Sequence, residues 1–155
     1  MTGLLSGAGL FVGAMFLQWW WNTHLSYWGA APQFLLAFTI LIAARRGAVP
    51  AMLAGFFWGL FLDVSRAELF GASALLLTLA GYLTGMARKQ LDLRDTGPLA
   101  ATVAILTWAA FIAHGLLGLV FTKSFEWGGW IPFLANPFLN AGAAIATSLA
   151  WEMRG

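Results

Sequence analysis

The chain has 155 residues, of which 61% are hydrophobic and 9% are charged, and its mean hydropathy is +0.80. A soluble domain usually carries about 25% charged residues, so this composition excludes an ordinary soluble fold and predicts a protein embedded in lipid. The absence of cysteine excludes disulfides, thiolate metal sites and cysteine nucleophiles. The net charge of +2 is small and dispersed, which argues against a nucleic-acid partner.

Apolar segments separated by turns or charged breaks predict six transmembrane helices. A span needs about 20 apolar residues, and residues 1–44 are uncharged and too long for one span. The turn residues Asn22, Gly29 and Pro32 divide this stretch into two helices. The predicted helices are Gly3–Trp21, Pro32–Ala44, Ala48–Leu62, Leu69–Ala87, Gly97–Thr122 and Trp130–Trp151. We therefore expect residues 1–155 to form a single six-span transmembrane domain, an all-α integral membrane protein folded as a compact bundle.

The distribution of Lys and Arg predicts the orientation, because cytoplasmic loops of membrane proteins carry an excess of these residues. If the N-terminus is cytoplasmic, the outer loops hold only Arg66 and Lys123. The inner segments then hold six basic residues: Arg45, Arg46, Arg88, Lys89, Arg94 and Arg154. This asymmetry predicts that both termini are cytoplasmic.

A glycine stripe runs along the predicted third helix and ends in an acid. Gly55, Gly59 and Asp63 are spaced four residues apart, so they share one helix face. Glycines lacking side chains let a second backbone approach closely, and such packing drives helix association in lipid. Asp63 has two interpretations. It either begins a solvated loop, paired with Arg66, or faces inward and fixes a neighbouring helix or a partner protein.

Several uncharged polar residues fall in the outer half of the predicted bundle. Together with Asp63 they would form one polar cluster, whose other members are Gln33, His114, Asn136 and Asn140. Each of them alone suits an interhelical hydrogen bond, worth about 0.6 kcal/mol on average in membrane proteins. The set also suits a ligand or partner site, and the sequence leaves both interpretations open.

Motifs that would mark an enzyme or a cofactor site are absent from the sequence. It contains no phosphate-binding Gly-x-x-x-x-Gly-Lys-Ser/Thr segment and no Gly-x-Ser-x-Gly elbow. His24 and His114 lie far apart and lack a His-Glu-x-x-His context, which disfavours zinc. An intramembrane enzyme acting on a lipid-linked precursor would have to rely on Asp63 with His114. We therefore expect no enzymatic activity, no catalytic residues, no cofactor and no metal.

The order of these features resembles a known family, the rod shape-determining membrane proteins MreD. The signature associated with that family is Gly-x3-Gly-x3-Asp-x7-Gly, which is matched here by Gly55, Gly59, Asp63 and Gly71. An aromatic residue, Tyr82, and the basic stretch RKQL follow at the places where the family has them.

Two further positions bear on the resemblance. The family has Pro followed by Asp or Asn at the start of the second span, whereas this chain has Pro32 and Gln33, which keeps an amide but not the acid. An Asn early in the last span is matched by Asn140. The basic C-terminal tail of some relatives is absent, because the chain stops at WEMRG.

The resemblance implies a non-catalytic scaffold or adaptor subunit of the bacterial cell-wall elongation complex, located in the inner membrane and helping to maintain rod shape. Its implied partner is the transmembrane helix and juxtamembrane region of MreC. Through MreC it would be linked to a glycosyltransferase, a penicillin-binding transpeptidase and MreB, with membrane lipid around it. Gly55, Gly59, Asp63 and Gly71 are the implied partner or helix-packing residues.

The family is also similar in fold to the substrate-binding subunits of energy-coupling-factor transporters, which are compact six-helix bundles. This similarity leaves an alternative function open, namely a vitamin-type small-molecule binding subunit that uses the outer polar cluster. Such subunits often carry an Ala-x-x-x-Ala motif in the first span, and this chain has only Gly-x-x-x-Gly pairs there.

Overall fold

A computed structural model describes residues 2–24, 33–64, 70–125 and 127–152, with side chains except those of residues 2–8, 10 and 11. This part of the chain forms six α-helices and no strand. The helices are α1 (Thr2–His24), α2 (Phe34–Arg46), α3 (Ala48–Val64), α4 (Ala72–Ala87), α5 (Thr96–Thr122) and α6 (Trp130–Glu152). The all-helical prediction is therefore confirmed for the described residues.

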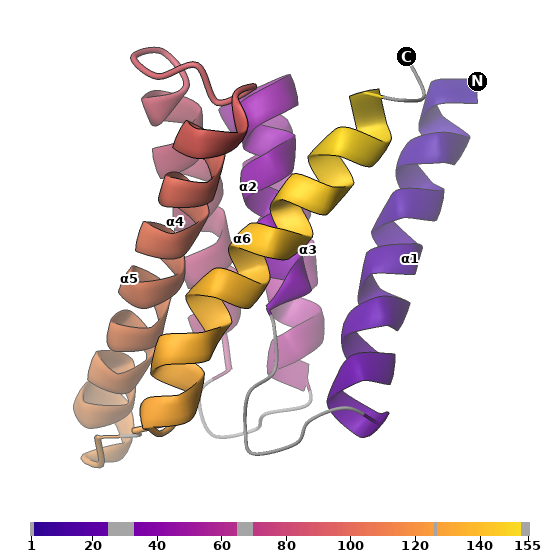
Figure 1. The fold of residues 1–155 in the computed structure, drawn as a ribbon. Coiled ribbons are helices and arrows are strands. Elements are labelled where there is room, and N and C mark those ends of the chain that lie inside the picture. The colour runs from indigo at the N-terminus through magenta and orange to yellow at the C-terminus, as the bar shows by residue number, and fades with distance from the viewer. Residues whose placement is uncertain (1, 25–32, 65–69, 126, 153–155) are drawn as a thin grey trace.

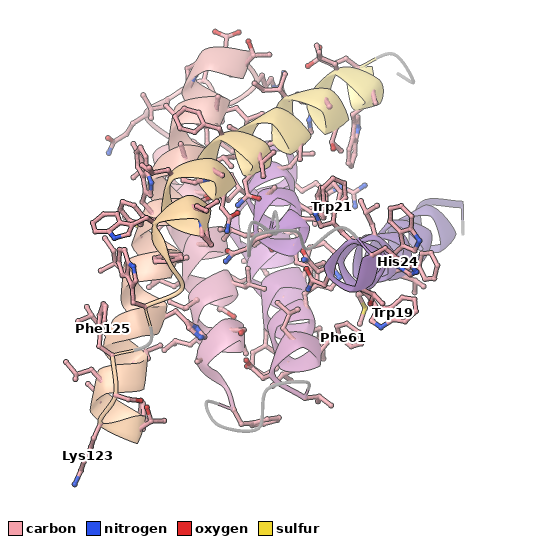
Figure 2. The ribbon with its side chains drawn as sticks, turned by 60° about the horizontal axis from the view of Figure 1, so that its bottom comes forward. Trp19, Trp21, His24, Phe61, Lys123 and Phe125 are labelled. Carbon is pink, nitrogen blue, oxygen red and sulfur yellow. The ribbon has the colours of Figure 1, made fainter. Side chains whose placement is uncertain are left out.

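The helices run up and down, so α1 begins and α6 ends at the same end of the bundle (Figure 1). We call the opposite end, where α1 ends and α6 begins, the distal end. The helix pair α3 and α4 makes the most extensive contact, and α5 packs chiefly on α6. Helix α1 packs mainly on α2 and stands to one side of the other five helices in two views (Figures 1 and 2).

The helix boundaries differ from the predicted ones at the distal end. Helix α3 extends two residues further than expected and includes Asp63, which had been placed at the start of a polar break. Helix α4 begins at Ala72 and not at Leu69, and α2 begins at Phe34 and not at Pro32. Apolar composition therefore located each helix, but the contacts that end it had to be seen in the structure.

The outside of the bundle is apolar. Large side chains such as Phe57 on α3, Val120 on α5 and Phe138 on α6 are more than half exposed. Among the described residues, α5 and α6 are long and apolar enough to cross a membrane, and α3 and α4 are shorter apolar helices. At the distal end, aromatic side chains such as Trp19 and Phe125 point outward (Figure 2). Exposed apolar surface on this scale suits contact with lipid and not with water.

Glycines from both partners bring α3 and α4 together. A Cβ atom on Gly59 would overlap the Cα and amide nitrogen of Ala74, and one on Gly55 would lie 2.7 Å from the carbonyl oxygen of Leu77. The same holds from the other side, where a Cβ on Gly85 would overlap Ala48. Because each obstacle is backbone or a Cβ atom, no side-chain rotation could make room. The backbones of this hairpin pack at a distance that only glycine permits.

A proline strengthens the contact between α5 and α6. Pro137 lies inside α6 and has no N–H, so the carbonyl of Phe133, four residues earlier, lacks its helical donor. The indole N–H of Trp108 on α5 donates to that carbonyl oxygen at 2.9 Å. The neighbouring helix thus supplies the hydrogen bond that the proline removes.

Candidate functional site

The carboxylate of Asp63 lies at the start of α4 and not in a solvated loop. Its side chain is 1% exposed and accepts three backbone hydrogen bonds. Oδ1 accepts from the amide of Ser73 at 3.0 Å, and Oδ2 accepts from Gly71 at 3.0 Å and Ala74 at 3.1 Å. These are amide groups of the N-terminal end of α4, which have no acceptor within the helix. Asp63 therefore caps a helix that it does not belong to.

Helix α4 needs this external cap because of the residue that precedes it. Its N-cap is Gly71, which has no side chain to accept a hydrogen bond and adopts a left-handed conformation with φ +96°. A residue with a Cβ atom would be strained there. The negative carboxylate also lies at the positive end of the α4 dipole, which is favourable. The spacing from Asp63 to Gly71 thus corresponds to a hairpin whose first helix caps the second.

Helix α2 also receives a cap from another helix. Gln33 precedes α2 and makes no side-chain capping bond of its own. The backbone N–H of Gln33 instead donates to Oδ1 of Asn140 on α6 at 2.7 Å. Asn140 is fully buried, and its Nδ2 donates to Oγ1 of Thr107 on α5 at 3.1 Å. One amide side chain therefore joins α2, α5 and α6.

Helix α1 contributes a weaker contact to the same helix start. The amide of Leu35 lies 3.5 Å from Oε1 of Gln18, at the long limit for a hydrogen bond. Nε2 of Gln18 donates to Oδ1 of Asn22 at 3.1 Å. Gln18 is buried although α1 packs mainly on α2, so this polar pair forms the inner face of α1 near the distal end.

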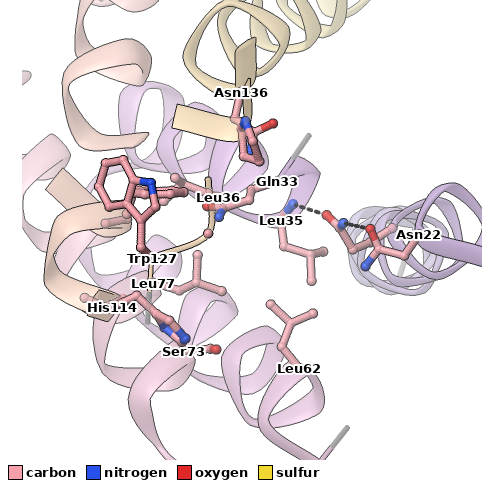
Figure 3. A pocket seen from close by; sticks show the side chains of 16 residues that line it. Asn22, Gln33, Leu35, Leu36, Leu62, Ser73, Leu77, His114, Trp127 and Asn136 are labelled. Atoms are coloured by element: carbon pink, nitrogen blue, oxygen red, sulfur yellow. Dashed lines mark hydrogen bonds between the residues drawn. The ribbon is translucent and has the colours of Figure 1, made fainter. Parts of the chain in front are cut away.

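These caps surround a cavity of about 510 Å³ that all six helices line (Figure 3). Its polar lining residues come from α1, the start of α2, α4, α5 and α6: Gln18, Asn22, Gln33, Ser73, His114 and Asn136. Apolar residues such as Leu62 and Leu77 line the opposite side (Figure 3). None of the described lining residues is Asp, Glu, Lys or Arg. The volume falls within the range of about 300–1,000 Å³ typical of small-molecule sites.

One lining residue carries an unpaired polar atom. Asn136 is 5% exposed, and its buried Oδ1 has no hydrogen-bond partner in the part of the chain that the structure describes. A buried acceptor without a partner is destabilising unless something outside the chain donates to it. Nearby, Trp127 and Phe111 meet edge to face with ring centroids 5.4 Å apart and line the same cavity.

The residues predicted to form one polar cluster are divided by the structure into two sets. Gln33, His114 and Asn136 line the cavity. Asp63 and Asn140 do not line it, but each bonds the backbone of a residue that does, namely Ser73 and Gln33. The predicted pairing of Asp63 with Arg66 concerns a residue outside the described part of the chain. The sequence gave no signal for Gln18 or Trp127, which had been interpreted only as apolar-span and interface residues.

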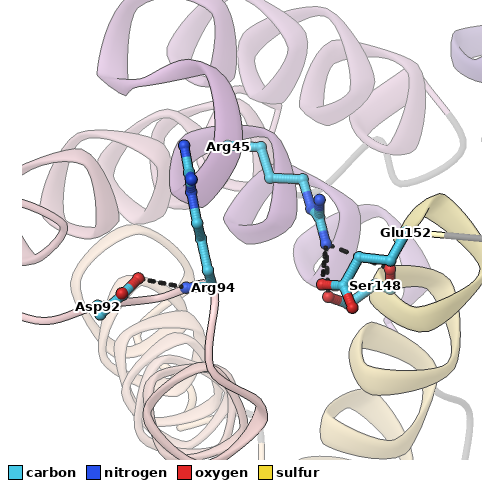
Figure 4. A network of polar contacts seen from close by, with 5 residues as sticks. All are labelled: Arg45, Asp92, Arg94, Ser148 and Glu152. Atoms are coloured by element: carbon cyan, nitrogen blue, oxygen red, sulfur yellow. Dashed lines mark hydrogen bonds and ion pairs between the residues drawn. The ribbon is translucent and has the colours of Figure 1, made fainter. Parts of the chain in front are cut away.

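The other end of the bundle holds a separate polar network (Figure 4). Nη2 of Arg45 on α2 donates to Oγ of Ser148 at 2.7 Å and to Oε1 of Glu152 at 3.1 Å, both on α6. The guanidinium groups of Arg45 and Arg46 each lie 5.5 Å from the centroid of the Trp151 ring. This network joins the end of α2 to the end of α6.

Nothing in the described residues is arranged for metal chemistry. They contain no group of three His, Asp or Glu side chains that could hold an ion. The arrangement supports helix packing, helix capping and the binding of an uncharged ligand in the cavity.

Comparison with known proteins gives one match. The family model described as rod shape-determining protein MreD matches residues 2–153, nearly the whole chain. No curated protein and no solved structure matches the chain.

Proposed function

Because the chain belongs to the MreD family of rod shape-determining membrane proteins, we propose that it is a non-catalytic adaptor of the cell-wall elongation complex that binds MreC. Family membership over residues 2–153 is the observation that carries the proposal. The proposed contact is with the transmembrane helix and juxtamembrane region of MreC. Through MreC the chain is linked to a glycosyltransferase, a penicillin-binding transpeptidase and MreB.

The proposal includes six membrane spans in the bacterial inner membrane, arranged as in energy-coupling-factor binding subunits. Three observations support it: six up-and-down helices, an apolar outer surface, and two helices long enough to cross a bilayer. Basic residues lie at the end where α1 begins, including Arg45, Arg46 and Arg94 (Figures 1 and 4). The positive-inside rule then makes both termini cytoplasmic and the distal end periplasmic.

The signature residues contribute to this function through the α3–α4 hairpin. Gly55, Gly59 and Asp63 all face α4, so their contacts lie inside the chain. We expect them to affect MreC binding by holding the outward face of α3 in shape. That face carries the exposed side chains of Leu53 and Phe57, which are available to a partner helix.

Co-purification tests the adaptor function. Tagged protein expressed with MreC should recover MreC from solubilised membranes, and the ratio of MreC to tagged protein is the measurement. Truncations of outward-facing side chains on three helices, Phe57→Ala, Ile112→Ala and Phe138→Ala, locate the surface, and at least one should lower the ratio. Gly142→Ala is the matched control, because a Cβ atom there meets nothing within 4 Å. Failure of the folded wild-type protein to recover MreC would reject the proposal.

The cavity favours a second candidate function, a vitamin-type binding subunit of an energy-coupling-factor transporter. Its volume and the lining amides Gln33 and Asn136 are the observations in favour. A panel of vitamins and their precursors added to the purified protein should then raise its thermal unfolding midpoint. A panel without any such effect would remove this candidate and leave the adaptor function untouched.

A further inference from the structure

We propose that the distal cavity binds an uncharged, hydroxyl-bearing ring, such as a glycosyl unit, carried by a lipid or free in solution. The proposal rests on the lining of the cavity alone. It holds whether or not the chain binds MreC, and it requires no transport activity.

The charge of the ligand follows from what surrounds the cavity. The described lining residues include no carboxylate to pair a cation and no Lys or Arg to pair an anion. A helix N-terminus often binds anions, and Ser73 of α4 does line the cavity. Its amide and that of Ala74 are already bonded to Asp63, so the α4 terminus is occupied by the chain's own carboxylate. A buried charged group would therefore lack compensation, which favours a neutral ligand.

The hydrogen-bonding capacity of the lining calls for a ligand that donates. Oδ1 of Asn136 is buried and unpartnered among the described residues, and it accepts only. A hydroxyl or amide N–H on the ligand would satisfy it. Across the cavity, the hydroxyl of Ser73 can donate or accept (Figure 3). A ring bearing hydroxyl groups on several edges matches polar groups that converge from opposite walls.

The aromatic part of the lining suits the apolar face of such a ring. Trp127 is 41% exposed and packs against Phe111, so an indole lies at the margin of the cavity. Aromatic faces carry partial negative charge and attract the weakly positive C–H groups of a sugar ring. Leu62 and Leu77 complete an apolar wall that also accommodates a lipid chain. Apolar walls with a few convergent polar groups are the usual composition of a ligand site.

Thermal unfolding of the protein in phosphatidylcholine nanodiscs tests the proposal. The probes are monoglucosyl-diacylglycerol, the same diacylglycerol without a head group, phosphatidic acid with the same acyl chains, and free methyl glucoside. The glucosyl lipid, the free glucoside or both should raise the unfolding midpoint, and which of them does so identifies the source. The headless and anionic lipids should not raise it. Equal stabilisation by all three lipids, or by none of the probes, would overturn the proposal.

Variants separate binding from folding. Asn136→Leu should unfold at the same temperature or higher without ligand, because it removes a buried unpaired acceptor. It should weaken glucosyl binding about 2- to 12-fold, the equivalent of one hydrogen bond. Thr147→Val, on the same helix but outside the cavity, is the matched control and should keep full binding. Undiminished binding by Asn136→Leu would show that the cavity is not the site.

Trp127→Leu and Trp130→Leu form a second matched pair. Both residues are exposed tryptophans at the start of α6, but only Trp127 lines the cavity. Loss of glucosyl binding in the first variant alone is the expected result. Equal losses in both variants would assign the effect to the membrane interface and reject the cavity as its cause.

Discussion

Replacing Asp63 is the sharpest test of the capping role. In Asp63→Ala the amides of Gly71, Ser73 and Ala74 lose their common acceptor at once. The Gly71 bond is only partly buried, but the bonds of Ser73 and Ala74 are buried, where water cannot replace the carboxylate. The perturbation is therefore concentrated on the first turn of α4.

The magnitude follows from the number of buried bonds. A hydrogen bond to a charged group contributes about 1.5–3 kcal/mol, so losing two buried ones should lower the free energy of unfolding by at least about 3 kcal/mol. Asp63→Asn should cost less, about 1–2 kcal/mol. Its carbonyl can take the place of Oδ2 and keep the bonds to Gly71 and Ala74, while its NH₂ faces the N–H of Ser73.

Two measurements check this order of stability. Equilibrium unfolding in detergent micelles, followed by helical circular dichroism, gives the loss for each variant. Hydrogen exchange then locates it, because amides 73 and 74 should exchange faster in Asp63→Ala. Asp92→Ala is the control, since this exposed carboxylate accepts one bond, from the amide of Arg94 at 3.1 Å. If Asp63→Ala were as stable as Asp92→Ala, with protected amides at 73 and 74, the capping argument would be refuted.

Three further substitutions test the other contacts by the same unfolding assay. Gly59→Ala should cost about 1–3 kcal/mol or more, because its Cβ overlaps the α4 backbone, whereas Gly142→Ala, in open space, should be neutral or slightly stabilising. Asn140→Leu should cost about 1–3 kcal/mol by leaving the backbone N–H of Gln33 unpaired, and rapid exchange of that amide would identify the cause. Arg45→Met should cost about 1 kcal/mol through its lost bonds to α6, and the loss should not change with salt if the buried hydroxyl of Ser148 dominates over the exposed Glu152.

The helices could be located from the sequence because apolar runs interrupted by Gly, Pro or charge report directly on burial in lipid. The ends of the helices could not, since the capping partners of α2 and α4 come from other helices. Asp63 is eight residues before Gly71, and Asn140 is 107 residues after Gln33. A local pattern search for a capping residue finds only Gly71 and Gln33 at these positions, and neither side chain caps its helix.

The candidate site was predictable in part for the same reason. Helical spacing placed Gly55, Gly59 and Asp63 on one face, and in the structure that face packs on α4. Which polar residues share a cavity depends on how the helices are arranged around each other, and no periodicity within one helix carries that information. Gln18 illustrates this limit, because in the sequence it is one polar residue in an apolar span.

The two borrowed caps relate the signature acid to the cavity. In lipid, an amide at a helix end has no water to bond, so the protein must supply an acceptor. Asp63 holds the amide of Ser73, and Asn140 holds the amide of Gln33, and both Ser73 and Gln33 line the cavity. The caps therefore fix opposite walls of a site that they do not enter.

It follows that changing Asp63 disturbs the α3–α4 hairpin and the cavity together. A loss of MreC binding in Asp63→Ala would not identify a contact surface, because the outward face of α3 and the wall at Ser73 move with the same cap. Phe57→Ala and Asn136→Leu separate the two effects, since the first alters an exposed helix face and the second alters the cavity lining. A partner that responds only to Phe57→Ala recognises the helix surface, and one that responds only to Asn136→Leu depends on the occupied cavity.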